Sequence, residues 1–164
     1  MNLRRATNHD SPALIALIDA VYREYGEVMH TAGADSDLLE IEGRYCGRQG
    51  DFVVLEDKQH HIVGCHATLP IDPENGLLTF RRLYLNKSLR GSGHGIRLMD
   101  WAVEWARDKG YRQVEFWSDT RFTTAHKFFE AYGFERTGDI RDMDDGALPY
   151  SEYFFRMNLT APDA

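Results

Sequence analysis

A glycine-rich turn is the segment whose residue types and spacing most directly imply chemistry. Three glycines alternate with other residues in Arg90-Gly91-Ser92-Gly93-His94-Gly95, just before the longest expected helix. The first N–H groups of a helix have no intrahelical partner, and the helix dipole makes that end electropositive. Glycines let the backbone approach an anion closely, and Arg90 adds a planar cation suited to phosphate oxygens. The turn therefore predicts a pyrophosphate site.

Three alternatives compete with this prediction. The glycines can simply end one element and begin the next, which is the plainer interpretation of a bare two-glycine pattern. A dinucleotide-binding turn has the pattern Gly-x-Gly-x-x-Gly, and here the third glycine comes one residue early. A Walker phosphate loop needs Gly-Lys followed by Ser or Thr, which this turn lacks. Both nucleotide-binding patterns are therefore excluded.

Acidic and histidine-rich segments elsewhere lack metal-ligand spacing. With Gly146 at the sixth position of a calcium loop, Arg141 and Met143 occupy ligand positions and cannot coordinate. His60-His61 has no partner at zinc spacing. We therefore expect no metal, and interpret four acidic residues as a solvated hairpin turn near the substrate mouth: Asp139, Asp142, Asp144 and Asp145.

Composition limits the classes of protein that fit. The 164 residues are 43% hydrophobic and 12% aromatic, which is ample for a packed core. A net charge of −7 argues against nucleic acid as a partner and mildly favours a cationic substrate. No apolar run approaches the ~18 residues of a membrane span, and the first ten residues contain no apolar signal region. Cys46 and Cys65 are interpreted as reduced thiols, so we expect a cytoplasmic protein without a membrane partner.

Apolar periodicity predicts the elements that position the turn. Helices are expected over 11–25, 37–45, 93–109 and 123–132. Strands are expected over 51–56, 61–69, 77–86, 113–118, 134–140 and 150–159. Short turns join the first three strands, which favours an antiparallel meander. The order αα-βββ-α-β-α-ββ predicts a mixed α/β fold in one domain spanning residues 1–164.

At the glycine-rich turn the sequence resembles the GNAT superfamily of N-acetyltransferases. The family's motif, Arg/Gln-x-x-Gly-x-Gly/Ala, is matched at every fixed position by residues 90–95. Residues 82–89 resemble the family's fourth strand and its run into the turn, and 125–134 resemble its second signature, a helix closing on Gly-Phe. The element order over 3–159 also agrees. The resemblance implies a mixed, mostly antiparallel central sheet flanked by helices.

The same resemblance implies acetyl-CoA as cosubstrate, in a cleft between the fourth and fifth strands. Backbone groups of Leu83, Tyr84 and Leu85 are expected to pair with its pantetheine arm. The backbone N–H groups of 91–95 are expected to bind its pyrophosphate. His94 need not take part through its side chain, which is interpreted as solvated.

The implied reaction is direct attack on the thioester by a primary amine of a small molecule or peptide. An alkylamine with a pKa of ~10.4 is neutral in only about one molecule in a thousand at pH 7. Generating the neutral amine is worth roughly 4 kcal/mol, so a base or a desolvating pocket matters. The departing thiol, with a pKa of ~8.5 by analogy with cysteine, presents the smaller problem.

Catalytic residues are harder to assign. Phe129 stands in the cofactor site where the family often has a tyrosine general acid, and phenylalanine cannot donate a proton. Tyr132 is the nearby substitute, although a core role fits it as well. Glu115 and His66 are candidate bases because both are expected on strands near the cleft, and each can equally be structural. A non-catalytic acetyl-CoA-binding or regulatory domain is therefore the alternative function, and a longer acyl chain is a weaker third.

The substrate wall is expected on the first two helices and their loop. Trp101 and Trp105 lie at helical spacing and are interpreted as core or dimer contacts, which leaves a homodimer open. The residues that can receive an amine, or be ordinary surface, are Tyr22, Tyr25, Glu27, His30 and Asp35.

Overall fold

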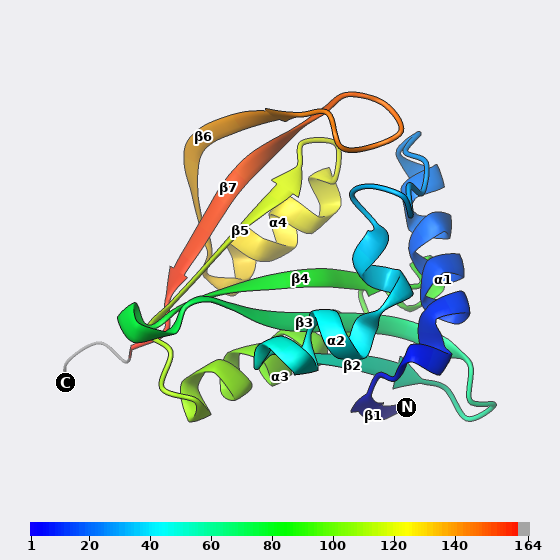
Figure 1. The fold of residues 1–164 in the computed structure, drawn as a ribbon, viewed down its shortest axis with the longest axis horizontal. Helices are drawn as coiled ribbons and strands as arrows, with labels where there is room; N and C mark the ends of the chain where they lie inside the picture. Colours follow the sequence, from blue (N-terminus) through cyan, green and yellow to red (C-terminus); the bar gives the residue numbers. More distant parts are fainter. Residues whose placement is uncertain (161–164) are drawn as a thin grey trace.

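A seven-stranded sheet with helices on both faces forms the fold in the computed structural model, which describes residues 1–160 (Figure 1). The strands lie in the order β1-β2-β3-β4-β5-β7-β6, and every neighbouring pair except β4 and β5 is antiparallel. The strands are β1 (Asn2–Arg5), β2 (Asp51–Glu56), β3 (Ile62–Asp72), β4 (Leu77–Leu85), β5 (Gln113–Asp119), β6 (Glu135–Met143) and β7 (Tyr150–Asn158). The helices are α1 (Ser11–Glu24), α2 (Ile41–Arg44), α3 (His94–Asp108) and α4 (Thr123–Tyr132).

The expected mixed, mostly antiparallel sheet is confirmed, and four local predictions differ. Asp139 and Asp142, expected in a solvated hairpin turn, lie in β6, which extends to Met143. The strand β1 was not predicted, because four residues with two arginines carry no apolar alternation and their place is set by pairing with β2. The helix expected over 37–45 is broken into a 3₁₀ turn, Ser36–Leu39, and the short α2. The strand β3 continues through Pro70, next to a register irregularity where a missing N–H is tolerated.

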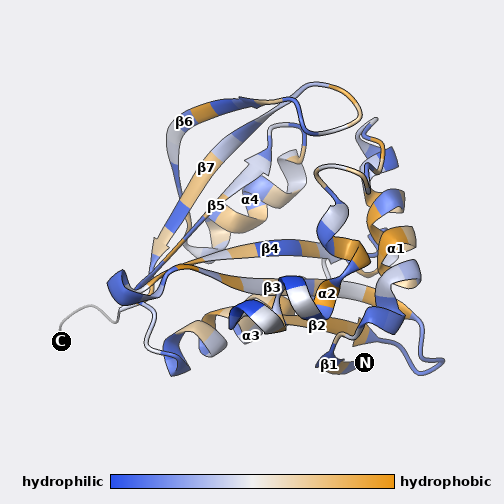
Figure 2. Ribbon diagram, in the orientation of Figure 1, coloured by the Kyte–Doolittle hydropathy of each residue, from blue (hydrophilic) through white to orange (hydrophobic). Residues whose placement is uncertain are grey.

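The two faces of the sheet carry different helices. Alternation along β2 places Phe52 and Val54 in the core under α1 and α2, whereas Val53 and Leu55 pack with Leu98 of α3. A second core joins α3 and α4 to β4, β5 and β7, and both Trp101 and Trp105 pack against it. Figure 2 shows the apolar segments on α1 and the central strands, and a polar turn between β2 and β3.

The strands β4 and β5 separate soon after they meet. They pair only at Leu77 with Gln113 and Leu78 with Val114, and Figure 1 shows them diverging from that end. The rest of the β4 edge therefore has no strand partner on the β5 side.

A β-bulge changes the direction of side chains in the exposed part of β4. Ala67 of β3 faces Arg81 and Cys65 faces Tyr84, so two residues of β4 lie opposite the single residue His66. Arg82 takes a left-handed backbone conformation, with φ of 60°. Bulges of this kind re-aim side chains next to functional sites.

Candidate active site

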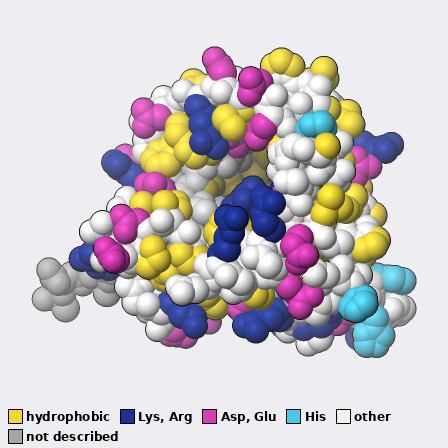
Figure 3. All heavy atoms as spheres, viewed as in Figure 1, with side chains coloured by type: hydrophobic (Ala, Val, Ile, Leu, Met, Phe, Trp, Pro, Cys, Tyr) yellow, Lys and Arg dark blue, Asp and Glu magenta, His cyan; other side chains and the backbone are white. Residues whose placement is uncertain are grey.

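A cavity of about 190 Å³ lies where β4 and β5 diverge. From the α3 and α4 side it is lined by His66, Met99 and Phe129, and from the α1 side by Tyr22 and Phe122. A hollow of about 290 Å³ adjoins it on the α1 side of the sheet. Figure 3 shows the hollowed face, with basic side chains at its mouth. The residues that line both spaces are Ala34, Phe80, Arg81, Phe116, Trp117, Tyr150 and Glu152.

The glycine-rich turn presents free backbone donors at the start of α3. Gly91 and Gly93 have φ of 79° and 89°, a region in which side chains other than glycine are strained. A Cβ added at either position meets no atom within 4 Å, so the surface of the turn is open. Among the backbone hydrogen bonds of the described residues, the N–H groups of 91–93 donate to no carbonyl. The first N–H groups of α3 continue this row of donors.

The side chain of Arg90 has a different place from the expected one. Its guanidinium donates to Glu24 at 2.7 and 3.0 Å and to the Leu85 carbonyl at 3.2 and 3.3 Å. Arg90 therefore ties the turn to α1 and to the end of β4. Because the Arg90 guanidinium is bonded to Glu24 and Leu85, the groups of the turn that are free to bind phosphate are its backbone N–H groups.

We expect Gly93→Val to weaken acetyl-CoA binding by about 10- to 100-fold, because a β-branched residue at positive φ costs a few kcal/mol and displaces the donors. Isothermal titration with acetyl-CoA measures the affinity. Gly110→Ala is the matched control, since Gly110 also has a positive φ, of 83°, but follows α3 at its far end. Equal affinity of the Gly93 variant and the wild type would contradict the assignment.

The Leu83 to Leu85 segment forms the part of β4 that no strand covers on the β5 side. Leu83 and Leu85 pack toward α3, whereas Tyr84 packs edge-on against Tyr22 with ring centroids 5.9 Å apart. An uncovered strand edge can pair with an extended ligand as another strand does. This edge leads directly into the glycine-rich turn.

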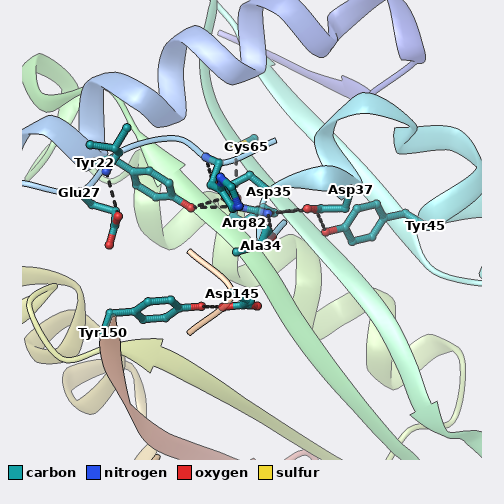
Figure 4. Close-up of polar contacts among 12 residues, drawn as sticks. Tyr22, Glu27, Ala34, Asp35, Asp37, Tyr45, Cys65, Arg82, Asp145 and Tyr150 are labelled. Atoms are coloured by element: carbon teal, nitrogen blue, oxygen red, sulfur yellow. Dashed lines mark hydrogen bonds and ion pairs between the residues drawn. The ribbon is translucent and has the colours of Figure 1, made fainter. Parts of the chain in front are cut away.

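A buried ionic network fixes the α1 side of the cavity (Figure 4). Arg82 is 8% exposed and donates to Asp35 at 3.0 Å and to Asp37 at 3.0 Å from its Nε atom. Tyr22 donates to Asp35 at 2.7 Å, and Tyr45 donates to Asp37 at 2.6 Å. The bulge aims Arg82 at these partners.

The network keeps Asp37 ionised in spite of its burial. Burial alone raises the pKa of Asp37, but the charge and hydrogen bonds of Arg82 outweigh it and hold that pKa below its usual value. Tyr22 and Asp35, which the sequence placed on the substrate wall, line the cavity through this network. Sequence spacing gave no sign that Arg82 would be their partner.

His66 lines the cavity but is 1% exposed. Its Nδ1 lies 3.0 Å from the Leu98 carbonyl, which can only accept, so Nδ1 carries the proton and Nε2 is an acceptor. Burial lowers the pKa of His66 to about 4, which makes the ring neutral at pH 7.

The other two catalytic candidates do not line the cavity between β4 and β5. Tyr132, at the end of α4, donates to Asp100 of α3 at 2.6 Å. Burial raises the pKa of Tyr132. Glu115 lines the adjoining hollow, on β5 opposite Arg156. Phe129 is buried between Phe116 and other aromatic rings and lines the cavity between β4 and β5, so an apolar ring stands where the resemblance implies a tyrosine.

Four carboxylates line the cavity between β4 and β5, and they differ in how their oxygens are used. Both oxygens of Glu27, Asp35 and Asp119 accept hydrogen bonds from described residues. Glu152 accepts from Arg141 at 2.9 and 2.7 Å through Oε1 alone. Its Oε2 accepts no hydrogen bond from residues 1–160, and burial raises the pKa of this carboxyl. The sequence did not single out Glu152, because it looked like one polar position of an alternating strand.

Comparisons with known proteins identify the family. A model described as an acetyltransferase (GNAT) domain matches residues 48–136, more than half of the chain. The chain belongs to the GNAT family. N-acetyltransferase 8F1 of Rattus norvegicus is 32% identical to this GNAT chain over 106 residues, which are 63% of the chain and 48% of the relative. The N-acetyltransferase YjgM of Escherichia coli K12 is 27% identical over 137 residues, 81% of each. The chain thus spans about half the length of the rat relative.

Solved structures share the GNAT fold. An acetyltransferase of the family from Staphylococcus aureus Mu50 has a TM-score of 0.81 at 20% identity, covering 97% of this chain and 99% of its own. A phosphinothricin acetyltransferase from Sinorhizobium meliloti in complex with acetyl-CoA has a TM-score of 0.74 at 19% identity, covering 99% and 92%. Within residues 1–160, no helix has both the length and the apolar character that crossing a membrane requires.

Proposed function

We propose that this GNAT chain is an acetyl-CoA-dependent N-acetyltransferase that moves an acetyl group to a primary amine of a small molecule or peptide. Residues 1–164 are proposed to form its single acetyltransferase domain. One observation carries the proposal: the cavity between β4 and β5 is lined by Leu83 and Tyr84 of the uncovered β4 edge and shares lining residues with the polar hollow on the α1 side. A thioester and an amine entering from opposite faces would meet in it.

The residues present fit acetyl-CoA. The backbone of Leu83, Tyr84 and Leu85 is the uncovered strand edge that suits an extended pantetheine arm. The N–H groups from Gly91 to Gly95 suit a pyrophosphate. When bound, acetyl-CoA supplies the activated acetyl group.

We propose Glu152 as the general base, in place of Glu115 or His66. Its Oε2 is free, it lines both spaces, and its pKa is raised above the usual carboxyl value. His66, with a pKa of about 4, is the weaker base at neutral pH. Tyr132 is tied to Asp100 outside the cavity.

The proposed step is direct attack. The amine nitrogen forms a bond to the acetyl carbonyl carbon, the carbon–sulfur bond breaks, and the amine proton passes to Oε2 of Glu152. The Ser118 hydroxyl lines the cavity 3.1 Å from Nε2 of His126, and is the protic group that Phe129 does not provide for the departing thiolate. The lack of a tyrosine donor at position 129 matters less than the lack of a base would, because the thiolate of a thiol with a pKa of ~8.5 leaves readily.

The family does not determine the acceptor. Relatives and structural neighbours include an N-acetylaspartate synthetase of Danio rerio and a ribosomal-protein-alanine N-acetyltransferase of Brucella melitensis, whose names indicate different acceptors. A cytoplasmic location and a homodimer stay predictions.

The test supplies acetyl-CoA with a broad panel of amines and follows free thiol release. We expect thiol release above hydrolysis with at least one amine class, together with a stoichiometric N-acetyl product in mass spectrometry. Acetyl-CoA binding measured by titration, with no thiol release across the panel, would instead support the non-catalytic acetyl-CoA-binding domain.

A further inference from the structure

Two arginines stand side by side on the α1 face of β4. Strand alternation directs Phe80 into the core with α3 and Arg81 to the opposite face. The bulge then keeps the next residue, Arg82, on the face of Arg81, where it bonds to Asp35 and Asp37. The backbone therefore delivers two positive charges to one wall of the cleft.

These two guanidiniums differ in what neutralises them. Arg82 is saturated by two aspartates, Tyr22 and the Ala34 carbonyl. Arg81 is half-buried and lines both the cavity and the hollow. Its backbone pairs with Ala67 of β3, yet its guanidinium makes no hydrogen bond or ion pair with any residue from 1 to 160. The third basic lining residue, Arg141, pairs with Glu152 and lies 4.4 Å over the Trp117 ring. Arg81 is the lining cation whose donors are uncommitted.

A half-buried guanidinium with five free donors favours binding of an anion, because it has lost part of its hydration and has no hydrogen-bond partner in the protein. The chain as a whole carries a net charge of −7, so its carboxylates outnumber its lysine and arginine side chains. Even so, the carboxylates around the cavity form ion pairs with other arginines and none with Arg81. The free oxygen of Glu152 lines the same spaces as Arg81.

We propose that Arg81 binds a carboxylate of the acceptor, so that the substrate is an amine that also carries a carboxylate, as an amino acid does. This inference rests on the proposed N-acetyltransferase function and names its substrate class. The amine faces Oε2 of Glu152, and the carboxylate takes a two-point hydrogen bond from the Arg81 fork. Apolar walls beside them accommodate the rest of the substrate: Ile71, Trp117, Met143 and Phe154.

The first test compares common L-amino acids with the amines that lack only their carboxylate, such as L-phenylalanine with 2-phenylethylamine. Wild-type kcat/KM, corrected for the neutral fraction of each amine, is expected to favour the amino acid of the preferred pair by about 10- to 100-fold, as a charge-assisted hydrogen bond provides. Equal or higher kcat/KM for the decarboxylated amines would overturn the inference.

The second test uses Arg81→Gln, with Arg48→Gln as the matched control, since Arg48 is exposed and lines neither space. In the Arg81 variant, KM for the preferred amino acid is expected to rise about 10- to 100-fold, while the decarboxylated amine is unaffected. Arg81→Lys is expected to restore part of the loss, because it keeps the charge but not the fork. An equal loss with both amines would indicate a structural role and would contradict the proposal.

A binding measurement separates this inference from the proposed function. N-acetyl-L-amino acids carry the carboxylate, so their binding to the wild type and the Arg81 variant is followed by titration without any turnover. Binding that depends on Arg81, together with no thiol release, would support the subsite and reject the transferase. Acetyl transfer to amines without dependence on Arg81 would support the transferase and reject the carboxylate subsite.

Discussion

Replacing Glu152 by glutamine is expected to lower kcat/KM for acetyl transfer by about 10²- to 10⁴-fold, the usual contribution of a positioned general base. Glutamine keeps an Oε1 atom that can accept from Arg141, so the local geometry is retained. What it loses is the free carboxylate oxygen. The affinity for acetyl-CoA is expected to stay within about twofold of the wild type. The reason is that the glycine-rich turn lies at the start of α3, whereas Glu152 lies on β7.

The control for this variant is Glu115→Gln on the adjoining strand. Glu115 lines the adjoining hollow but not the cavity between β4 and β5, so its replacement is expected to change kcat/KM by less than about threefold. Stopped-flow or steady-state thiol assays measure both variants. The assignment of Glu152 would be abandoned if the Glu115 variant lost the activity and the Glu152 variant kept it.

The pH dependence gives an independent readout of the same residue. Because burial raises the pKa of Glu152, its carboxyl gains a proton at a higher pH than an ordinary glutamate, and the protonated form cannot accept one from the amine. The acidic limb of the wild-type kcat/KM profile is therefore expected to include a carboxyl titration above pH ~4.3, which the glutamine variant lacks.

Asp37→Ala is expected to give the largest loss of stability, about 3–5 kcal/mol, because it leaves Arg82 as a buried charge without one of its two carboxylate partners. The hydroxyl of Tyr45 loses its acceptor in the same variant. Urea unfolding measures the free energy. Asp19→Ala is the control: Asp19 pairs with the exposed Arg23 one turn away on α1, and its loss is expected to cost about 0.5 kcal/mol or less.

The sign of the pH effect follows from the lowered pKa of Asp37. In the unfolded chain an aspartate titrates near pH ~3.9, and in the folded chain it does so at lower pH. The stabilisation is therefore fully present above pH ~3.9 and is lost as the pH falls through the folded pKa, since the unfolded state then binds more protons. The Asp37→Ala variant is expected to show a smaller loss of stability over this acidic range. An unchanged acidic slope would contradict the network's role.

Local sequence patterns predicted most of the elements, for reasons visible in particular residues. The helix before Gly133 and the strand from Asp51 were predicted with the bounds they have, because periodicity and a terminating glycine specify them without distant partners. The helix expected over 37–45 failed for the opposite reason. Asp37 is held by Arg82, far away along the chain, and this contact overrides the local preference.

The glycine-rich turn belongs to what the sequence determined by itself. Positive φ at Gly91 and Gly93 and free N–H groups at the start of α3 follow from adjacent residues, so the motif was sufficient to predict them. Glu152 and Arg81 belong to what only the tertiary structure decided. Each looked like an ordinary polar strand position, and its importance depends on which oxygens and guanidiniums other strands leave unpaired. That inventory depends on a bulge in β4 and on the separation of β4 from β5, which are properties of strand pairing across the sheet.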